Sequence, residues 1–205
     1  MLKRTSIKHI NSILKKNPDW KILDIGCGYR ANENANVVAD VQDFSELYKN
    51  KKFVRINNKI LPFQNNEFDF VIASHVIEHV EDFEFFIKEL ERISSKGYIE
   101  LPTRLEDNLV FENKIDHIWW FCFDDISNQL LASKRNQLLN PFITVSMIKL
   151  LETAFRESLV IELSWDKNIE YKIDNKIMNE DFKKISFFKI IKKFFSKNMR
   201  TLLRK

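Results

Sequence analysis

The stretch Lys21-Ile22-Leu23-Asp24-Ile25-Gly26-Cys27-Gly28 is a short apolar run that ends in a carboxylate and two glycines spaced by one residue. An apolar run of this kind is typical of a strand buried on both faces of a parallel sheet. Glycines directly after such a strand let backbone N–H groups approach a ligand closely, at the sheet edge where ligands bind. The stretch therefore predicts an α/β fold with a ligand-binding loop at residues 24–28.

Similar short runs continue along the first hundred residues, and an amphipathic helix separates the last two of them. This helix is predicted at 83–93, where Asp82 can cap the N-terminus and apolar side chains recur at helical spacing. A strand, a helix and a strand in this order imply a right-handed crossover between parallel strands. The predicted strands are 21–24, 36–40, 53–56, 68–74 and 98–101, and an N-terminal helix is predicted at 4–16.

The second half of the chain is expected to add an insertion, a helix and a hairpin. Residues 102–141 form either a lid over a pocket or an ordinary loop-and-helix insertion. Their aromatic cluster consists of Trp119, Trp120, Phe121 and Phe123. A helix is predicted at 144–156, and strands at 158–165 and 169–173 are interpreted as a hairpin. The predicted fold class is α/β, with a Rossmann-like, mostly parallel sheet and a C-terminal antiparallel hairpin.

Two carboxylates indicate which ligand the loop can hold. The second strand ends in Asp40, which can accept hydrogen bonds from both hydroxyls of a ribose. The third glycine of the G-x-G-x-x-G pattern that seats a pyrophosphate is missing from residues 29–31. Asp24 would repel a pyrophosphate, but it would attract the α-ammonium of a methionine moiety. A nicotinamide oxidoreductase is therefore the less favoured alternative.

Three segments resemble motifs of the class I S-adenosylmethionine-dependent methyltransferases, in the order found there. The first is Leu23-Asp24-Ile25-Gly26-Cys27-Gly28. The second consists of Leu61-Pro62-Phe63 and residues 67–80, and it is similar to the type 11 subgroup. The third is Gly97-Tyr98-Ile99-Glu100-Leu101-Pro102. The resemblance covers residues 20–102 by motif, and it extends to about 175 by the expected closing helix and hairpin. It implies S-adenosylmethionine as the cofactor and a methyltransferase domain at 1–175, followed by a tail at 176–205.

The resemblance also implies roles for residues that follow the predicted strands. The methionine end of the cofactor would be lined by Asp24, Gly26, Cys27 and Gly28, and the ribose would be bound by Asp40. The adenine would be surrounded by Ile56, Asn57 and Asn58. The cofactor and the substrate entrance would be faced by Ser74 and His75. Asn57 stands where the family often has an aspartate, and its side-chain carbonyl can accept the same hydrogen bond from the adenine amino group.

One segment departs from the family. Only eight residues, 29–36, separate Gly28 from the second strand, where the family usually has a full helix. These residues cannot form a helix that crosses the sheet and also supply two loops. We expect the first crossover to be a loop or a single turn. The departure keeps open the alternative that the chain is a non-catalytic member that serves as an interaction module.

His75 and His117 are candidate bases for removing a proton from a hydroxyl or amine acceptor. Methyl transfer is an in-line displacement that is served largely by proximity and alignment, so a dedicated base is not required. Packing for His75 and a buried ring hydrogen-bonded to the backbone for His117 are the alternatives. His75 and His79 lie four residues apart around Glu78, but His75 is expected on a loop, so we expect no metal site.

Charge is unevenly spread along the chain. Residues 181–205 carry nine of the 33 basic side chains and one of the 29 acids, whereas the preceding 180 residues carry 24 basic and 28 acidic side chains. An acidic body argues against a nucleic-acid groove. The tail predicts a basic amphipathic helix, which suits contact with an anionic membrane surface without spanning it. Docking of this helix on its own domain or on a dimer partner and binding of the tail to nucleic acid are the alternatives.

The predicted function is methyl transfer from S-adenosylmethionine to a small-molecule or glycan-type acceptor. The fourth strand is followed by Ser74-His75-Val76-Ile77 rather than the Asn/Asp-Pro-Pro-Tyr motif of enzymes that methylate nucleic-acid amino groups, so nucleic acid is not expected as the substrate. Two cysteines and the absence of a leader-like opening predict a cytoplasmic location, peripheral at a membrane if the tail binds one.

Overall fold

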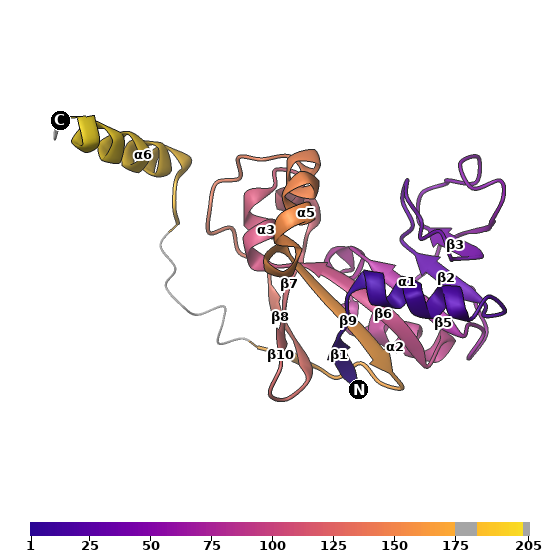
Figure 1. Cartoon of the computed structure of the whole chain (residues 1–205). Helices are drawn as coiled ribbons and strands as arrows, with labels where there is room; N and C mark the ends of the chain where they lie inside the picture. The colour runs from indigo at the N-terminus through magenta and orange to yellow at the C-terminus, as the bar shows by residue number, and fades with distance from the viewer. Residues whose placement is uncertain (175–183, 203–205) are drawn as a thin grey trace.

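The structure is a computed structural model that describes residues 1–174 and 184–202 (Figure 1). A central sheet has the strand order β1-β9-β6-β5-β2-β3-β4. Its strands are β1 (Leu2–Arg4), β2 (Ile22–Ile25), β3 (Val37–Asp40), β4 (Lys52–Arg55), β5 (Phe70–Ser74), β6 (Lys96–Pro102) and β9 (Val160–Asp166). The strands from β2 to β6 run parallel, and β9 is antiparallel to both β6 and β1. The predicted α/β class and mostly parallel sheet are confirmed.

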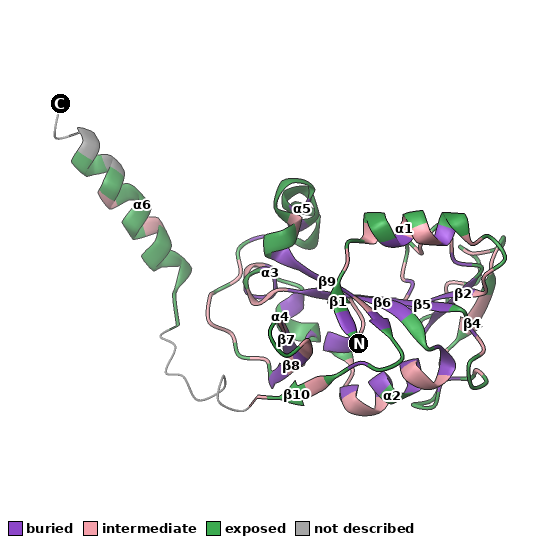
Figure 2. Cartoon of the chain, turned by 60° about the horizontal axis from the view of Figure 1, so that its bottom comes forward, coloured by how far each residue is buried: buried purple, intermediate pink, exposed green. Residues whose placement is uncertain are grey.

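Helices cover both faces of the parallel strands (Figure 2). Helix α1 (Ile7–Lys16) begins after Ser6 and packs Ile10 and Leu14 against one face, together with Ile22 of β2. Helix α2 (Phe83–Ile93) packs its apolar side against the other face, together with Leu23. The Asp82 side chain accepts a hydrogen bond from the Phe85 N–H, so the predicted cap is confirmed. Burial on both faces explains why these strands are apolar throughout.

The crossover from β2 to β3 contains no helix, as its length predicts. Two side chains from the next connection hold this loop in place. The Lys51 ammonium donates to three backbone carbonyls within residues 32–35, and the Tyr48 hydroxyl donates to the Gly28 carbonyl at 2.8 Å. Side-chain donors therefore satisfy loop carbonyls, which a crossover helix would have paired within its own backbone.

The predicted insertion is an ordered unit that packs on the end of the central sheet. It contains helices α3 (Arg104–Leu109) and α4 (Asn113–Asp116) and the antiparallel strands β7 (Trp119–Asp124) and β8 (Gln129–Lys134). The aromatic residues of β7 are buried, and Trp119 packs edge-on against Phe83 of α2 with ring centroids 4.6 Å apart. A lid function for this unit stays a prediction.

The two C-terminal strands form near the predicted positions but do not pair with each other. Strand β9 is bordered by β6 on one side and β1 on the other, so it has no free edge for a hairpin partner. Strand β10 (Tyr171–Ile173) instead joins β8 in parallel, in a separate three-stranded sheet. The predicted hairpin at 158–173 is therefore corrected. Helix α5 (Val145–Leu159) precedes β9, near the predicted bounds.

The tail forms helix α6 (Phe187–Leu202), as expected, and this helix lies apart from the body in Figures 1 and 2. Its start is anchored where Ile185 pairs with Leu139 and where the ring of Phe187 stacks on that of Phe142 at 5.5 Å. Residues 175–183 and 203–205, most of them in the predicted tail, lie outside the described residues. Within the described ranges, none of the helices has the length and apolar character needed to cross a membrane.

Candidate functional site

The glycine loop follows β2 at the point where the strand order reverses, since β3 and β5 lie on opposite sides of β2. Such a switch point is where open α/β sheets bind ligands. Gly26 and Gly28 both adopt left-handed backbone angles, with φ of 69° and 48°. A Cβ on Gly26 would lie 2.2 Å from Val76 Cγ2, whereas a Cβ on Gly28 would have no atom within 4 Å. Gly26 therefore permits packing against the segment after β5, and Gly28 borders open space.

Two buried aspartates lie beside this loop. Asp40 Oδ2 accepts a hydrogen bond of 3.0 Å from the Gly28 N–H, and its Oδ1 accepts one of 2.9 Å from the Gln42 N–H. Asp24 Oδ2 accepts a bond of 2.6 Å from the Asn32 N–H in the short crossover. Burial raises the pKa of Asp24 to about 7, although the Asn32 bond opposes this rise. Each carboxylate oxygen can accept a further hydrogen bond from a ligand.

The residues predicted to surround the adenine lie next to Asp40. The Ile56 N–H donates to the Asp40 carbonyl at 2.8 Å, while Asn57 and Asn58 follow Ile56 on the exposed surface. Cys27 is buried, and burial raises the pKa of its thiol to about 12, so the thiol is un-ionised at neutral pH. The contact of Asn57 with adenine stays a prediction.

His75 follows Ser74, the last residue of β5, in a left-handed conformation with φ of 55°. Its Nδ1 lies 3.3 Å from Glu78 Oε1 and its Nε2 lies 3.1 Å from Glu100 Oε1. Burial alone would lower the pKa of His75, but the two carboxylates raise it to about 10. The ring is therefore an imidazolium at neutral pH, and the structure argues against its predicted role as a proton-accepting base.

His117 is 9% exposed and joins a buried network. Its Nδ1 lies 2.6 Å from Asp107 Oδ1, and Asp107 Oδ2 also accepts from Arg135 Nε at 2.7 Å and from the Trp120 indole N–H. The ring is buried, as the alternative for His117 predicts, but its partner is the Asp107 carboxylate rather than the backbone. The ring of His79 packs edge-on against that of His117, with centroids 4.5 Å apart.

Several buried acids of this region are not among the predicted site residues. Glu100, at the end of β6, accepts from the Tyr98 hydroxyl at 2.8 Å and pairs with the Arg156 guanidinium. Burial opposes ionisation, but His75 and Arg156 bring the pKa of Glu100 to about 2. The signal in the sequence is an acid near the carboxyl end of an apolar strand, as for Asp24 and Asp40. Asp107, on α3, carries no comparable signal.

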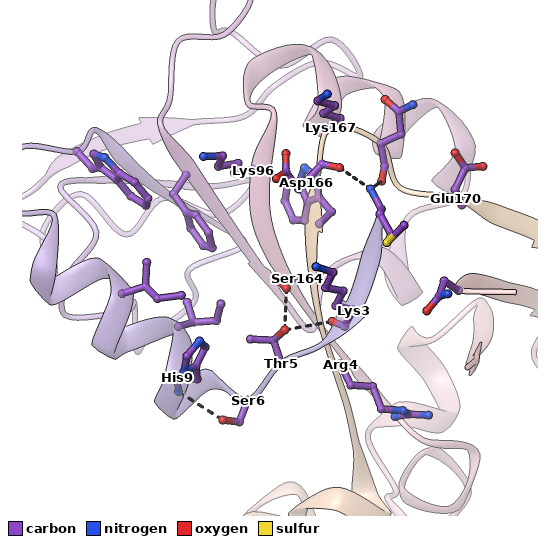
Figure 3. Close-up of a pocket in the computed structure, with 18 of the residues that line it drawn as sticks. Lys3, Arg4, Thr5, Ser6, His9, Lys96, Ser164, Asp166, Lys167 and Glu170 are labelled. Atoms are coloured by element: carbon purple, nitrogen blue, oxygen red, sulfur yellow. Dashed lines mark hydrogen bonds between the residues drawn. The ribbon is translucent and has the colours of Figure 1, made fainter. Parts of the chain in front are cut away.

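An open groove of about 1030 Å³ lies near the amino ends of β5 and β6 (Figure 3). It is bordered by β1 and α1, and it includes Phe70 and Lys96, the first residues of β5 and β6. Thr5 and Ser164 hydrogen-bond to each other within it at 2.7 Å. Ligands of open α/β sheets bind at the carboxyl ends of the strands. The groove is therefore separate from the candidate site.

The chain is similar to known proteins over the residues that include the glycine loop. Residues 23–99 match a family model described as a methyltransferase domain. An uncharacterized protein of Methanocaldococcus jannaschii, MJ0638, is 31% identical over 121 residues, which are 51% of this chain and 51% of that protein. The chain thus spans about half the length of this curated relative.

Two solved structures are similar over most of the chain. The PH0226 protein of Pyrococcus horikoshii is 16% identical, with a TM-score of 0.43, over 78% of this chain and 88% of that one. An S-adenosylmethionine-dependent methyltransferase of Mesorhizobium loti is 12% identical, with a TM-score of 0.42, over 75% and 96%. Residues 23–99 thus match a methyltransferase domain, and their motifs are similar to those of the class I S-adenosylmethionine-dependent methyltransferases, whose cofactor is S-adenosylmethionine.

Proposed function

We propose that this chain transfers a methyl group from S-adenosylmethionine to a small-molecule or glycan-type acceptor. The observation that carries the proposal is the open space at Gly28, with the carboxylates of Asp24 and Asp40 beside the loop. Asp24 would attract the α-ammonium of the cofactor, and Asp40 would accept hydrogen bonds from the ribose hydroxyls. The acceptor would approach from the carboxyl ends of β5 and β6.

The reaction is an in-line displacement at the methyl carbon. A lone pair of the acceptor oxygen or nitrogen forms the new bond to carbon, and the electrons of the breaking carbon–sulfur bond go to sulfur, which leaves S-adenosylhomocysteine. Alignment of the two partners supplies most of the acceleration. The acceptor's proton goes to water or to a base. His117 fits that role better than His75, because His75 is already protonated between Glu78 and Glu100.

Calorimetry with the full chain tests the proposal against its alternatives. We expect S-adenosylmethionine and S-adenosylhomocysteine to bind and NAD not to bind. Release of S-adenosylhomocysteine in the presence of small hydroxyl, amine or glycan acceptors would then show turnover. Cofactor binding without turnover of any acceptor would favour a non-catalytic member. Binding of NAD alone would favour an oxidoreductase, and binding of none of the three would favour an interaction module.

We further propose that α6 contacts an anionic membrane surface. Phe188, Phe194 and Phe195 of α6 are 81%, 63% and 60% exposed, so these three aromatic side chains face solvent rather than the body. The helix carries four lysines and one arginine and no acid. Exposed aromatic residues together with an excess of basic residues match an interface of lipid headgroups and acyl chains. Co-sedimentation with vesicles that contain phosphatidylserine tests this proposal.

A further inference from the structure

We propose that Glu78, His79 and His117 bind one divalent transition-metal ion. Each residue offers one ligand atom, and these three atoms lie within 4.8 Å of one another. Two imidazoles and one carboxylate form a donor set that holds Zn²⁺ or Fe²⁺ in proteins and leaves further coordination positions open. The sequence predicts no metal site around His75 and His79, and the structure supplies His117 as the second imidazole from a distant part of the chain.

The fold brings the three residues together through the backbone. Glu78 and His79 lie in a short 3₁₀-helix, η1 (Ile77–His79), which follows β5, and His117 precedes β7. The Ile118 N–H donates to the Glu78 carbonyl at 2.8 Å, so the segment of His117 is tied to η1. The rings of His79 and His117 meet at a right angle. The cluster therefore rests on main-chain contacts between two ordered segments.

Hydrogen bonds already set both imidazoles for metal binding. His79 Nδ1 lies 3.1 Å from the Asp116 carbonyl, which can only accept, so this nitrogen carries the proton. His117 Nδ1 donates to the Asp107 carboxylate in the same way, at 2.6 Å. In each ring these hydrogen bonds use Nδ1, so Nε2 is the atom left to bind a metal ion. A metal-bound histidine usually donates its other ring N–H to a carboxylate or a backbone carbonyl, and both kinds of partner are present here.

Glu78 provides an independent observation that points to a cation. Its side chain is 0% exposed. Oε1 pairs with His75 Nδ1 at 3.3 Å, whereas Oε2 has no hydrogen-bond or ion-pair partner among the described residues, and no described lysine or arginine pairs with Glu78. A buried carboxylate with one unsatisfied oxygen is costly, and a metal ion bound at that oxygen would remove the cost.

Metal binding requires a small closure of the three side chains. Ligand atoms around tetrahedral Zn²⁺, with bonds of about 2.0 Å, lie roughly 3.3 Å apart. His79 is exposed and can shift toward the other two. The site lies beyond the carboxyl end of β5, so if the proposed function holds, an oxygen of the acceptor would take an open position. His117 would then be a ligand, and the metal ion would lower the pKa of the acceptor hydroxyl in place of a base.

The test uses the full chain without an affinity tag, treated with a chelator and dialysed. We expect calorimetry with ZnCl₂ to give one site per chain, and Co²⁺ to produce a visible absorption band. His79→Ala and Glu78→Gln should weaken Zn²⁺ binding by more than roughly 100-fold, and Asp107→Asn by roughly 10- to 100-fold, because Asp107 acts through His117. His9→Ala, which removes an exposed histidine of α1, is the matched control and should bind Zn²⁺ as the unmodified chain does.

Three outcomes would overturn the metal site. These are no binding of Zn²⁺ or Co²⁺ by the unmodified chain, unchanged binding by His79→Ala, and an equal loss in His9→Ala. Thermal unfolding of each variant without metal shows that it is folded, and Zn²⁺ should raise the unfolding temperature of the unmodified chain but not that of His79→Ala. A chain that binds Zn²⁺ but not S-adenosylhomocysteine would refute the proposed function and leave the metal site standing.

Discussion

The Gly28 N–H donates a hydrogen bond of 3.0 Å to Asp40 Oδ2, which joins the glycine loop after β2 to the end of β3. The Asp40 carbonyl in turn accepts from the Ile56 N–H at 2.8 Å, just after β4. One residue thus connects the ends of three neighbouring strands. A ligand over Gly28 would meet the carboxylate of Asp40, and this residue is held in place by hydrogen bonds to both its side chain and its main chain.

Asp40→Asn is therefore expected to weaken S-adenosylhomocysteine binding by roughly 10- to 100-fold. The amide keeps one acceptor oxygen, but it removes the negative charge that strengthens hydrogen bonds from the ribose hydroxyls. Calorimetry of the two proteins at one salt concentration measures the effect. Asp43→Asn changes the same charge at an exposed position nearby and should bind as the unmodified chain does. Equal affinities for all three proteins would remove Asp40 from the site.

Gly26→Ala should destabilise the fold more than Gly28→Ala. Both positions have positive φ, which costs an alanine about 1 kcal/mol, but only the Cβ at position 26 would meet another side chain, Val76. We expect losses in the free energy of unfolding of about 2–4 kcal/mol for Gly26→Ala and about 1 kcal/mol for Gly28→Ala. Urea denaturation measures both values.

A double-mutant cycle tests the cause of that difference. Val76→Ala removes the methyl group that Gly26→Ala would contact, so the double variant should be more stable than the sum of the single effects by about 1–2 kcal/mol. Simple additivity would mean that the chain relieves the contact in another way.

Asp24→Asn is expected to stabilise the ligand-free protein at neutral pH. The folded-state pKa of about 7 lies above the ordinary value of 3.8, so the folded chain holds this proton more tightly than the unfolded chain. Asp24 therefore lowers the free energy of unfolding as the pH rises from about 4 to about 7, and the loss is complete above that range. The variant lacks this loss and should be more stable by at least about 1 kcal/mol at pH 8. Denaturation at pH 4 should show a much smaller gap.

Asp24→Asn is expected to have the opposite effect on cofactor binding, because the substitution that stabilises the fold should weaken the affinity for S-adenosylmethionine. An α-ammonium beside Asp24 favours the ionised form, so the affinity for S-adenosylmethionine should rise as the pH increases through about 7. Asp24→Asn should bind weakly and should lose this rise. A variant that is more stable and also binds as tightly as the unmodified chain would contradict the proposed role of Asp24.

Asp107→Ala should cost about 3–5 kcal/mol in the free energy of unfolding, because it leaves the buried Arg135 guanidinium without its carboxylate. Asp107 itself is 0% exposed and accepts hydrogen bonds from three side chains. Asp125→Ala is the contrasting variant, because its pair with Arg4 is solvent-exposed on both sides and should contribute no measurable stability. Urea denaturation of both variants checks the contrast, which would fail if their losses were equal.

The parallel core of the fold is readable from the sequence because its strands are buried on both faces and appear as continuous apolar runs. Strand β1 has only three residues and no such run, so it is not predicted. That omission also explains the incorrect hairpin, because β1 occupies the edge of β9 that β10 would have needed. Pairing between strands far apart in the chain is set by which edges are already filled, and local pattern does not contain that information.

The sequence predicts those site residues that stand at the ends of predicted strands. Asp24 and Asp40 end predicted strands, and the structure brings both to the glycine loop. The protonation of His75 is not readable, because it depends on Glu100 from the neighbouring strand β6. The meeting of His79 with His117 depends likewise on an insertion whose path the sequence leaves open.

Reversing two charges on α6 should weaken binding to vesicles of phosphatidylcholine mixed with phosphatidylserine. Lys192→Glu with Lys193→Glu is expected to lower the affinity by at least roughly 30-fold, since each basic residue near an anionic surface contributes about 1 kcal/mol. Lys8→Glu with Lys16→Glu makes the same change in net charge on exposed positions of α1, and it should alter binding far less. Binding should weaken with added salt and vanish on phosphatidylcholine alone. Equal losses from the two double variants would point to attraction by net charge, and α6 would then have no specific role at the membrane.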